Sequence, residues 1–279
     1  MKAEAASLTQ WALWAGQHAL PIFLALLGFL LAATVACWWA RRRYTASPWQ
    51  ANSAQAGSIG PRIAVGVATI VAGAAVFAAL AAQLAPGKEL GLADQAFIDG
   101  WRAGVPPLAL HVFAALTHLG DAATRSGLCI VMAIALMAYG RRWLAFGWVI
   151  AVAGNGLLTQ FLKQIFGRAR PPHLDGLVLE QGFGFPSGHS SGSVVAYGML
   201  AYLSLRLLPA RWHLPVLVAA VALAFAVGAS RVFLRVHFAS DVIAGFATGV
   251  SCLAACIMAI ETIRWHHQQS RMPQAATGR

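Results

Sequence analysis

The chain has 279 residues, of which 59% are hydrophobic and only 10% are charged, and its mean hydropathy is +0.66. Soluble domains carry roughly 25% charged residues, so this composition excludes an ordinary soluble domain and indicates a protein of the lipid bilayer. A net charge of +11 would suggest nucleic-acid binding in a soluble protein. In a membrane protein the distribution of basic residues among the loops is more informative, and we expect no nucleic-acid partner.

Seven apolar segments are long enough to cross a bilayer, since each crossing needs about 20 residues. We predict these spans at 20–40, 63–84, 122–140, 143–162, 189–208, 214–233 and 236–260. The sequence therefore predicts an all-α fold, a polytopic membrane helix bundle with a six-span core and one extra N-terminal span. The bilayer itself is thus an expected partner.

The segments between the spans differ in character. Trp11 and Trp14 indicate an interfacial helix within residues 1–19. We expect an amphipathic surface helix at 92–101 and a short helix at 108–119 that stops at Gly120-Asp121. The Ser-, Ala-, Gly- and Gln-rich stretch 44–60 predicts a flexible linker, and the polar tail from Glu261 is expected to be loose. We divide the chain into 1–60 (N-terminal helix and linker), 61–265 (membrane domain) and 266–279 (basic tail).

Topology follows from the basic residues in each loop, because cytoplasmic loops of membrane proteins are enriched in Lys and Arg. One side of the predicted bundle carries eleven arginines, and of the nine acidic residues only Glu261 lies there. These arginines are Arg41, Arg42, Arg43, Arg62, Arg141, Arg142, Arg206, Arg211, Arg264, Arg271 and Arg279. We therefore expect that side to face the cytoplasm of a bacterial inner membrane, and the 163–189 and 230–241 loops to face the periplasm or exterior.

The stretch 230–241, Ser-Arg-Val-Phe-Leu-Arg-Val-His-Phe-Ala-Ser-Asp, places three reactive side chains at the mouth of an apolar helix. If that helix begins near Val236, His237 and Asp241 share one face. The carboxylate can then hold one ring nitrogen and leave the other free for chemistry. Arg231 offers a fork of donors suited to an oxyanion such as phosphate. A structural His–Asp pair at a membrane surface is the alternative interpretation of this stretch alone.

Lys163 and Arg170-Pro171 follow the predicted fourth span. Cations at this position also occur as snorkelling side chains that only anchor a helix. Asn155 and Thr159 precede Lys163 at four-residue steps and form a polar stripe. Such a stripe either leads to a site or holds two membrane helices together.

The block Pro186-Ser187-Gly188-His189 begins the predicted fifth span. Proline is common in the first turn of a helix, glycine lets the backbone approach a ligand, and free N–H groups at a helix N-terminus bind anions. His189 is then placed to exchange a proton with a bound anion.

Together these residues suit the chemistry of a phosphoryl group. Three cationic side chains and two main-chain N–H groups would neutralise its oxygens, namely Lys163, Arg170, Arg231, Ser187 and Gly188. His237 would attack phosphorus while Asp241 keeps its other nitrogen protonated. His189 would protonate the leaving oxygen and then activate the water that cleaves the phosphohistidine. Because the sequence has no cluster of acidic, His or Cys residues with metal-ligand spacing, we expect no metal or other cofactor.

These three blocks resemble the tripartite signature of the type 2 phosphatidic acid phosphatases, which share a fold with vanadium haloperoxidases. The blocks are Lys163-x6-Arg170-Pro171, Pro186-Ser187-Gly188-His189 and Ser230-Arg231-x5-His237-x3-Asp241. The resemblance covers residues 63–263 and implies a six-helix membrane core, metal independence and a phosphohistidine mechanism with the roles given above. Residues 1–60 lie outside that core. Arg168 and Arg235 lie beside residues of the blocks but outside the matching pattern, and we expect both to be surface charges.

An outward-facing site walled by helices suits a phosphate on a lipid whose tail stays in the bilayer. The resemblance suggests a phosphohydrolase acting on undecaprenyl diphosphate, phosphatidic acid or phosphatidylglycerol phosphate. The alternatives are a lipid phosphotransferase, a vanadate-dependent peroxidase, and a non-catalytic phosphate carrier or scaffold. The position of the reactive residues at helix ends argues against a transport path. Gly245 and Gly249 predict either close helix packing or a groove for a lipid tail.

Overall fold

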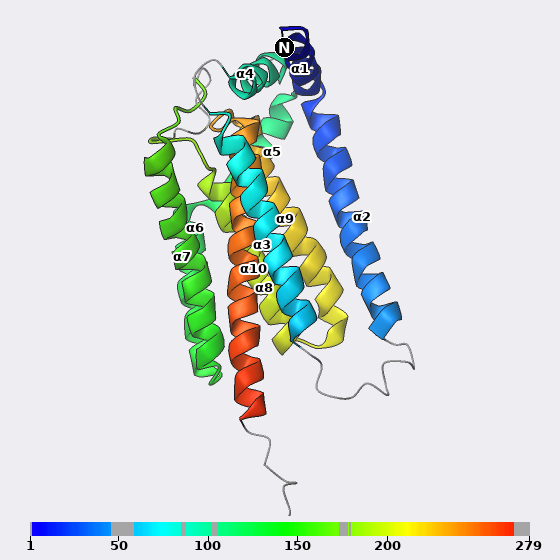
Figure 1. Ribbon diagram of the computed structural model, residues 1–279, viewed down its shortest axis with the longest axis vertical. Coiled ribbons are helices and arrows are strands. Elements are labelled where there is room, and N and C mark those ends of the chain that lie inside the picture. The colour runs from blue at the N-terminus through cyan, green and yellow to red at the C-terminus, as the bar shows by residue number, and fades with distance from the viewer. Residues whose placement is uncertain are drawn as a thin grey trace, which may run out of the picture.

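The computed structural model describes residues 2–45, 59–84, 88–101, 105–172, 178 and 180–270, which form helices and no strand. The long helices run side by side along the length of the molecule (Figure 1). In chain order the elements are α1 (Lys2–Gln17), α2 (Ala19–Thr45), α3 (Gly60–Ala81), α4 (Glu89–Trp101), α5 (Pro107–Thr117), η2 (His118–Gly120), α6 (Ala122–Ala138), α7 (Arg142–Phe166), α8 (Gly188–Leu207), η3 (Ala210–Trp212), α9 (His213–Phe233) and α10 (Ala239–Gln269).

The prediction of an all-helical membrane bundle is confirmed. Among the described residues, five helices are long and apolar enough to cross a membrane, and α5 with α6, bent by 45° at their junction, adds a sixth. We predicted seven spans, and α8 is the one that is not among these candidates. Its 20 residues include polar and small side chains that are buried against neighbouring helices, so its composition is less apolar than that of a lipid-facing span.

Helix α8 lies at the centre of the bundle, because most of its residues are buried. Met199 and Leu203 pack with Trp148 of α7 in one core cluster. Gly245 and Gly249 bring α10 against α8: a Cβ on Gly245 would lie 2.6 Å from the carbonyl oxygen of Ser187, and one on Gly249 would lie 2.8 Å from a backbone oxygen of α8. The two glycines therefore serve helix packing, one of the two alternatives that the sequence left open.

Helices α1 and α4 lie together across the end of the bundle at which α10 begins (Figure 1). Two glycines allow their close contact, since a Cβ on Gly16 or Gly100 would fall within 2.2 Å of a carbonyl oxygen of the other helix. The expected interfacial and surface helices thus form one cap. The extra N-terminal helix α2 packs on the core through Phe23, whose ring lies 5.5 Å from that of Phe225 and 5.2 Å from that of Phe113.

Helix α10 begins at Ala239, not near Val236. Arg235 adopts a left-handed conformation with φ of 57°, which interrupts the chain between α9 and α10. Asp241 then accepts a hydrogen bond from the N–H of Phe238 at 3.0 Å, as in the first turn of a capped helix. At its other end α10 continues to Gln269, and Glu261 accepts from Tyr202 Oη at 2.5 Å.

The predictions on the tail and on the linker have different outcomes. The expected loose tail from Glu261 is wrong up to Gln269, because those residues continue α10, and Glu261 itself contacts Tyr202 and Arg206 of α8. Most of the predicted linker and residues 271–279 lie outside the described part of the chain.

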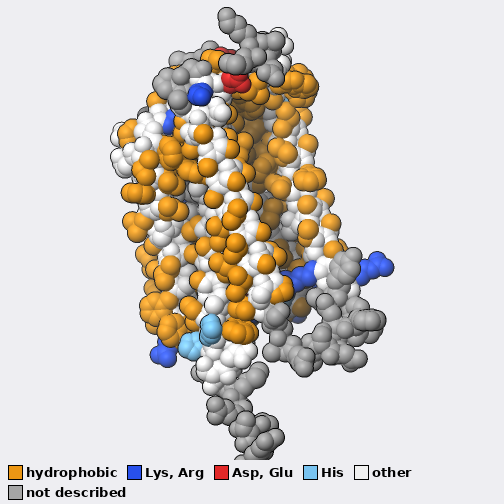
Figure 2. All heavy atoms as spheres, viewed as in Figure 1, with side chains coloured by type: hydrophobic (Ala, Val, Ile, Leu, Met, Phe, Trp, Pro, Cys, Tyr) orange, Lys and Arg blue, Asp and Glu red, His pale blue; other side chains and the backbone are white. Residues whose placement is uncertain are grey.

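The outer surface is apolar along the flanks of the bundle (Figure 2). Large side chains such as Phe29, Val65, Ile130 and Leu157 are exposed there. In water such a surface would drive aggregation, whereas in a bilayer it contacts acyl chains. This distribution agrees with a multi-pass membrane protein.

Candidate functional site

The structure brings the three sequence blocks together at the end of the bundle that α1 and α4 cover. Helix α7 ends with Lys163 in its last turn and with Gly167 in a left-handed conformation, φ 54°. Helix α8 begins at Gly188, α9 carries Arg231 in its last turn, and α10 carries Asp241 in its first turn. Helix ends supply free N–H and C=O groups, so this junction can hold both charges and hydrogen bonds.

His237 lies in the turn between α9 and α10, 1% exposed, and its Nδ1 is 3.3 Å from Asp241 Oδ2. The expectation that both residues share a helical face is therefore wrong, although their pairing is present. Asp241 is fully buried, and its position at the start of α10 lets it hold the ring and the N–H of Phe238 with the same oxygen. The helix start thus orients the histidine.

Arg170 fixes the tautomer of this histidine. Its Nη1 lies 3.1 Å from His237 Nε2 and donates to the carbonyl oxygen of Val236 at 2.9 Å. A guanidinium only donates, so Nε2 must carry the lone pair and Nδ1 the proton that faces Asp241. Burial, followed by the charges of nearby cations, lowers the pKa of His237 well below its ordinary 6.5. His237 is therefore a neutral imidazole at pH 7 with an available lone pair.

Arg168 is not a surface charge, and that prediction is wrong. Its Nη1 donates to Asp241 Oδ1 at 2.6 Å, and its Nη2 donates to Asp94 Oδ2 at 2.8 Å. Asp94 comes from α4, 5% exposed, and also accepts from the N–H and hydroxyl of Ser240. A continuous chain of hydrogen bonds and ion pairs thus runs from Asp94 through Arg168 and Asp241 to His237.

The charge states of Asp94 and Arg168 follow from the hydrogen bonds between them and Ser240. Burial raises the pKa of Asp94 above 3.8, against hydrogen bonds that lower it. Burial lowers the pKa of Arg168, but its carboxylate partners outweigh burial, and the net pKa is raised. We treat Asp94 as ionised at neutral pH, because the guanidinium and the Ser240 N–H can only donate to it.

Arg231 is fully buried at the end of α9. Its Nη1 donates to Thr117 Oγ1 at 2.7 Å, and its Nη2 contacts Glu180 Oε1. Glu180 Oε2 lies 3.6 Å from Arg170 Nη2. Although burial raises the pKa of Glu180, the charges of Arg231, His189 and Arg170 outweigh it, and the net pKa is lowered. A carboxylate therefore already lies among the three basic groups that we expected to surround phosphate.

Lys163 and Gly188 lie at the edges of this arrangement. Lys163 Nζ donates to the carbonyl oxygen of Phe183 at 2.9 Å, so the loop before α8 holds the ammonium group in place. Gly188 is the first residue of α8, where N–H groups have no partner within the helix. Phosphate binding by its N–H group stays a prediction.

Ser187 has a different place from the one we expected. Its N–H donates to the carbonyl oxygen of Asp241 at 2.9 Å, so this group is engaged within the protein and is not a free phosphate donor. Its hydroxyl caps α8 by accepting from the N–H and hydroxyl of Ser190. Pro186 consequently precedes the cap instead of lying in the first turn. Ser187 therefore joins the starts of α8 and α10.

His189 lies in the first turn of α8, and its Nε2 is 2.9 Å from Asp121 Oδ1. Asp121 precedes α6 and also contacts His118 Nδ1 at 2.8 Å. No motif marks Asp121 as this partner, and only the predicted helix break at Gly120-Asp121 falls there. Because the carboxylate holds Nε2–H, the Nδ1 atom of His189 is left for proton exchange.

The remaining predicted polar residues have structural surroundings. Asn155 and Thr159 both contact Ser191 Oγ of α8, at 3.4 and 3.0 Å, so their stripe joins two helices. Arg235 is 7% exposed and lies over the ring of Trp101 at 5.7 Å, so the prediction of a surface charge is wrong for this residue also. His173 lies outside the described residues.

The arrangement can bind an anion and carry out proton transfer and nucleophilic attack. His237, oriented by Asp241, lies next to Arg170. A second histidine–carboxylate pair, His189 with Asp121, lies near the same cationic side chains. No group of three or more His, Cys, Asp or Glu side chains that could hold a metal ion occurs within the described ranges. The cationic groups are therefore the electrophilic partners that this part of the chain offers to a phosphate.

Known proteins are similar to this chain in sequence and in fold. Residues 142–265, which contain all three blocks, match the family model of the PAP2 superfamily. Phosphatidylglycerophosphatase B of Bacillus subtilis (strain 168) is 33% identical over 146 residues, which are 52% of this chain and 71% of that protein. Lipid A 1-phosphatase of Rhizobium johnstonii is 36% identical over 128 residues, which are 42% of this chain and 49% of that protein.

A solved structure resembles most of this chain. It is the crystal structure of a transmembrane PAP2-type phosphatidylglycerolphosphate phosphatase from Bacillus subtilis, with a TM-score of 0.65 and 29% identity. The match covers 70% of this chain and 97% of that chain, so nearly all of the solved protein has a counterpart here.

Proposed function

We propose that this chain, which belongs to the PAP2 superfamily and is a phosphatase of that type, hydrolyses the phosphate of a membrane lipid. The reaction passes through a phosphohistidine on His237. The observation that carries the proposal is the state of that histidine. Its Nε2 lone pair faces Arg170, 3.1 Å away, and its Nδ1–H faces Asp241. A nucleophile in this state needs no deprotonation before attack.

In the first step the substrate phosphoryl group displaces the Glu180 carboxylate from the guanidinium groups. Arg170, Arg231 and Lys163 neutralise the phosphoryl oxygens, and the N–H of Gly188 donates to one of them. The Nε2 lone pair of His237 forms the bond to phosphorus as the bond to the lipid oxygen breaks. His189 takes up a proton as the negatively charged phosphoryl group binds, and it gives this proton to the leaving oxygen.

In the second step the phosphohistidine is cleaved by water. His189, now neutral, accepts a proton from a water molecule. The oxygen of that water attacks phosphorus, and the P–N bond breaks. Nε2 of His237 recovers its lone pair and inorganic phosphate leaves. Throughout, Asp241 stabilises the positive charge that the ring carries while it is bonded to phosphorus, and Arg168 keeps the carboxylate in place.

The substrate that we propose first is phosphatidylglycerol phosphate. The B. subtilis relative and the solved B. subtilis structure are both named for that substrate, and the structural match covers 97% of the solved chain. Phosphatidic acid, a phosphate monoester, and undecaprenyl diphosphate, a phosphoanhydride, also end in a phosphoryl group and are the next substrates to test. The apolar flanks of the bundle would keep the tail of any of these lipids in the bilayer.

We further propose that the site faces the periplasm of a bacterial inner membrane. The end of the bundle opposite His237 carries arginines of α2, α7 and α10, namely Arg42, Arg43, Arg142 and Arg264 (Figure 1). Basic residues favour the cytoplasmic side. Protease or cysteine-labelling access to the two ends in intact cells and in inverted vesicles tests this orientation.

The experiment that tests the reaction is phosphate release in detergent, with EDTA, from the three lipids. Wild type is compared with His237→Ala and with His111→Ala, an exposed histidine of α5 as the matched control. We expect release by wild type and by the control only. Rapid quenching of wild type with labelled substrate should trap an acid-labile phosphoprotein that His237→Ala lacks.

Two outcomes would overturn the proposal. Release by the His237→Ala variant at the rate of wild type would exclude His237 as the nucleophile. A phosphorylated second lipid instead of free phosphate would show a phosphotransferase that uses the same histidine.

A further inference from the structure

We propose that a pocket at the other end of the bundle binds an anionic phospholipid, with the headgroup on arginines and the upper acyl chains on an apolar wall. The pocket has a volume of about 870 Å³ and lies between the start of α7, the end of α8 and the C-terminal half of α10. Along α7 the deepest lining residue, Ile150, is 13 residues before Lys163, which is roughly 20 Å at 1.5 Å per residue. It is therefore distinct from the phosphatase site.

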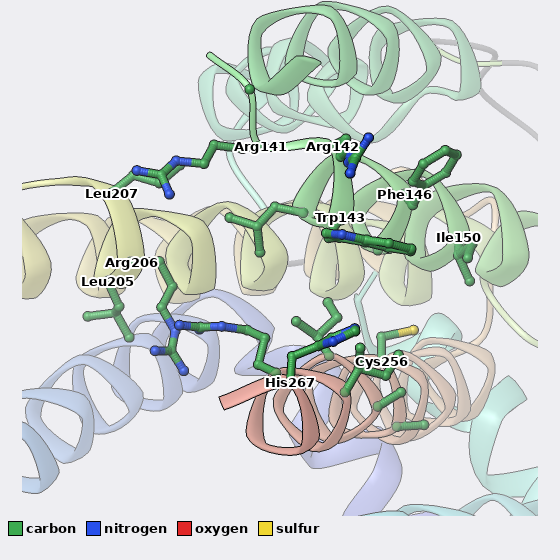
Figure 3. Close-up of a pocket in the computed structure, with 18 residues that line it drawn as sticks. Arg141, Arg142, Trp143, Phe146, Ile150, Leu205, Arg206, Leu207, Cys256 and His267 are labelled. Atoms are coloured by element: carbon green, nitrogen blue, oxygen red, sulfur yellow. The ribbon is translucent and has the colours of Figure 1, made fainter. Parts of the chain in front are cut away.

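The opening of the pocket is strongly basic. Four arginines line it, and none of its 18 lining residues is acidic; they are Arg141, Arg142, Arg206 and Arg264. Figure 3 shows Arg141 and Arg142 on one side of the opening and Arg206 on another.

The two pairs of arginines differ in their partners. Arg206 and Arg264 both contact Glu261 Oε1 just outside the pocket. Arg141 and Arg142, both exposed, have no carboxylate partner within the described ranges. These two side chains are therefore available to an external anion. The first turn of α7, on which Arg142 lies, adds the positive end of a long helix dipole.

The inner wall is apolar and faces the lipid. Trp143, Phe146 and Ile150 follow one another along α7 and are exposed by 62%, 56% and 65%. Across the pocket α10 contributes Ala259 and Ile263. The side chains thus change from arginine at the bundle end, through tryptophan, to purely apolar groups deeper in (Figure 3).

This order matches the parts of a phospholipid along the bilayer normal. Tryptophan is typical of the headgroup level, and apolar residues face the acyl chains. A free phosphate ion would need only the arginines and would leave the apolar wall without a partner. Basic pockets between membrane helices are the sites at which anionic lipid headgroups bind. The combined charge and apolar wall therefore favour an anionic lipid over a soluble anion.

A binding experiment on delipidated protein in detergent tests this inference independently of catalysis. Phosphatidylglycerol and cardiolipin are added, and bound lipid is counted by native mass spectrometry and by the rise of the thermal midpoint. Phosphatidylcholine and glycerol 3-phosphate serve as the zwitterionic lipid and the headgroup-sized soluble anion. The variants are the double substitution Arg141→Gln with Arg142→Gln, and Ala259→Trp, which fills the exposed wall. Arg211→Gln, an exposed arginine outside the pocket, is the matched control.

We expect wild type and the Arg211→Gln control to bind the two anionic lipids equally. The double variant should bind them roughly 20-fold more weakly, since each basic residue near an anionic headgroup contributes about a factor of five. Ala259→Trp should also lose affinity while it keeps all four arginines.

The inference is overturned if the double variant and the control bind alike. It is also overturned if phosphatidylcholine binds as well as phosphatidylglycerol, or if glycerol 3-phosphate competes as strongly as intact lipid. Phosphate release from the substrate panel, measured on the same preparations, shows whether the catalytic end remains intact in each variant.

Discussion

Replacement of Asp94 by Asn tests whether the ion-pair chain behind the nucleophile positions it. Asp94 accepts from Arg168 Nη2 at 2.8 Å, from the Ser240 N–H at 3.2 Å and from the Ser240 hydroxyl. An asparagine keeps the shape but offers one oxygen, and its NH₂ group must face a donor. A hydrogen bond to a charged group contributes about 1.5–3 kcal/mol, and loss of one partner of a buried pair costs about 3–5 kcal/mol.

The expected loss lies at the lower end of these ranges, because Arg168 keeps its second carboxylate, Asp241. We expect Asp94→Asn to reduce the free energy of unfolding by about 2 kcal/mol. The freed guanidinium can shift with Asp241, and a displacement of about 1 Å in a catalytic group costs up to about 10²-fold in rate. We therefore expect kcat to fall by about 10- to 100-fold with little change in KM, since Asp94 does not contact the substrate.

The assay is steady-state phosphate release together with the thermal midpoint in detergent. Asp99→Asn is the matched control, because Asp99 lies exposed on the same helix and contacts only Gln95 among the partners described for it. Arg168→Gln and the double variant complete a cycle. If Asp94 acts on His237 through Arg168, the double variant Asp94→Asn with Arg168→Gln should lose little more activity than Arg168→Gln alone. Activity of Asp94→Asn equal to that of Asp99→Asn, or an effect on KM alone, would refute the reasoning.

Three further outcomes follow from the site. Glu180→Gln should lower KM and the inhibitory constant of orthophosphate several-fold, because a carboxylate no longer competes for Arg231; an unchanged constant for phosphate would contradict this. Arg170→Gln should move the acid limb of the pH profile of kcat/KM to higher pH. Loss of a nearby cation raises the pKa of His237, so the ring becomes protonated at a higher pH. Acid limbs at the same pH in wild type and variant would count against this prediction. Gly245→Ala should destabilise the protein by about 1–3 kcal/mol by overpacking α10 on α8, whereas Gly28→Ala, with open space around it, should be close to neutral in the thermal midpoint.

Local sequence pattern was sufficient for the helices and for the reactive residues within each block. Apolar runs of about 20 residues predict membrane helices because an unsatisfied backbone is costly in lipid. The blocks at 163–171, 186–189 and 230–241 are short, so their residues stay together in any fold. The start of α10 was misplaced because its apolar pattern continues upstream of the left-handed Arg235. Hydropathy does not record such a backbone turn.

The partners of the reactive residues could not be predicted, because they lie far away in the chain. Asp94 and Arg168 are 74 residues apart, and Asp121 and His189 are 68 apart. Nothing in the spacing of these residues marks them as neighbours. For Arg168 the default of a surface charge failed for a physical reason: an arginine beside an active site is buried when carboxylates from other helices balance its charge.

The carboxylates of the site differ in how firmly they are held, and this difference bears on the reaction. The side chains of Asp94 and Asp241 are 4% and 0% exposed and bind Arg168, and Asp241 also holds the ring of His237, the nucleophile that we propose. The side chain of Glu180 is 26% exposed and comes from the loop before α8. It balances Arg170 and Arg231, the cations that we assign to phosphate. Exchange of this loop carboxylate for a phosphoryl group would leave buried cations paired at every stage, so the site could bind a dianion without first exposing unpaired arginines to the apolar interior.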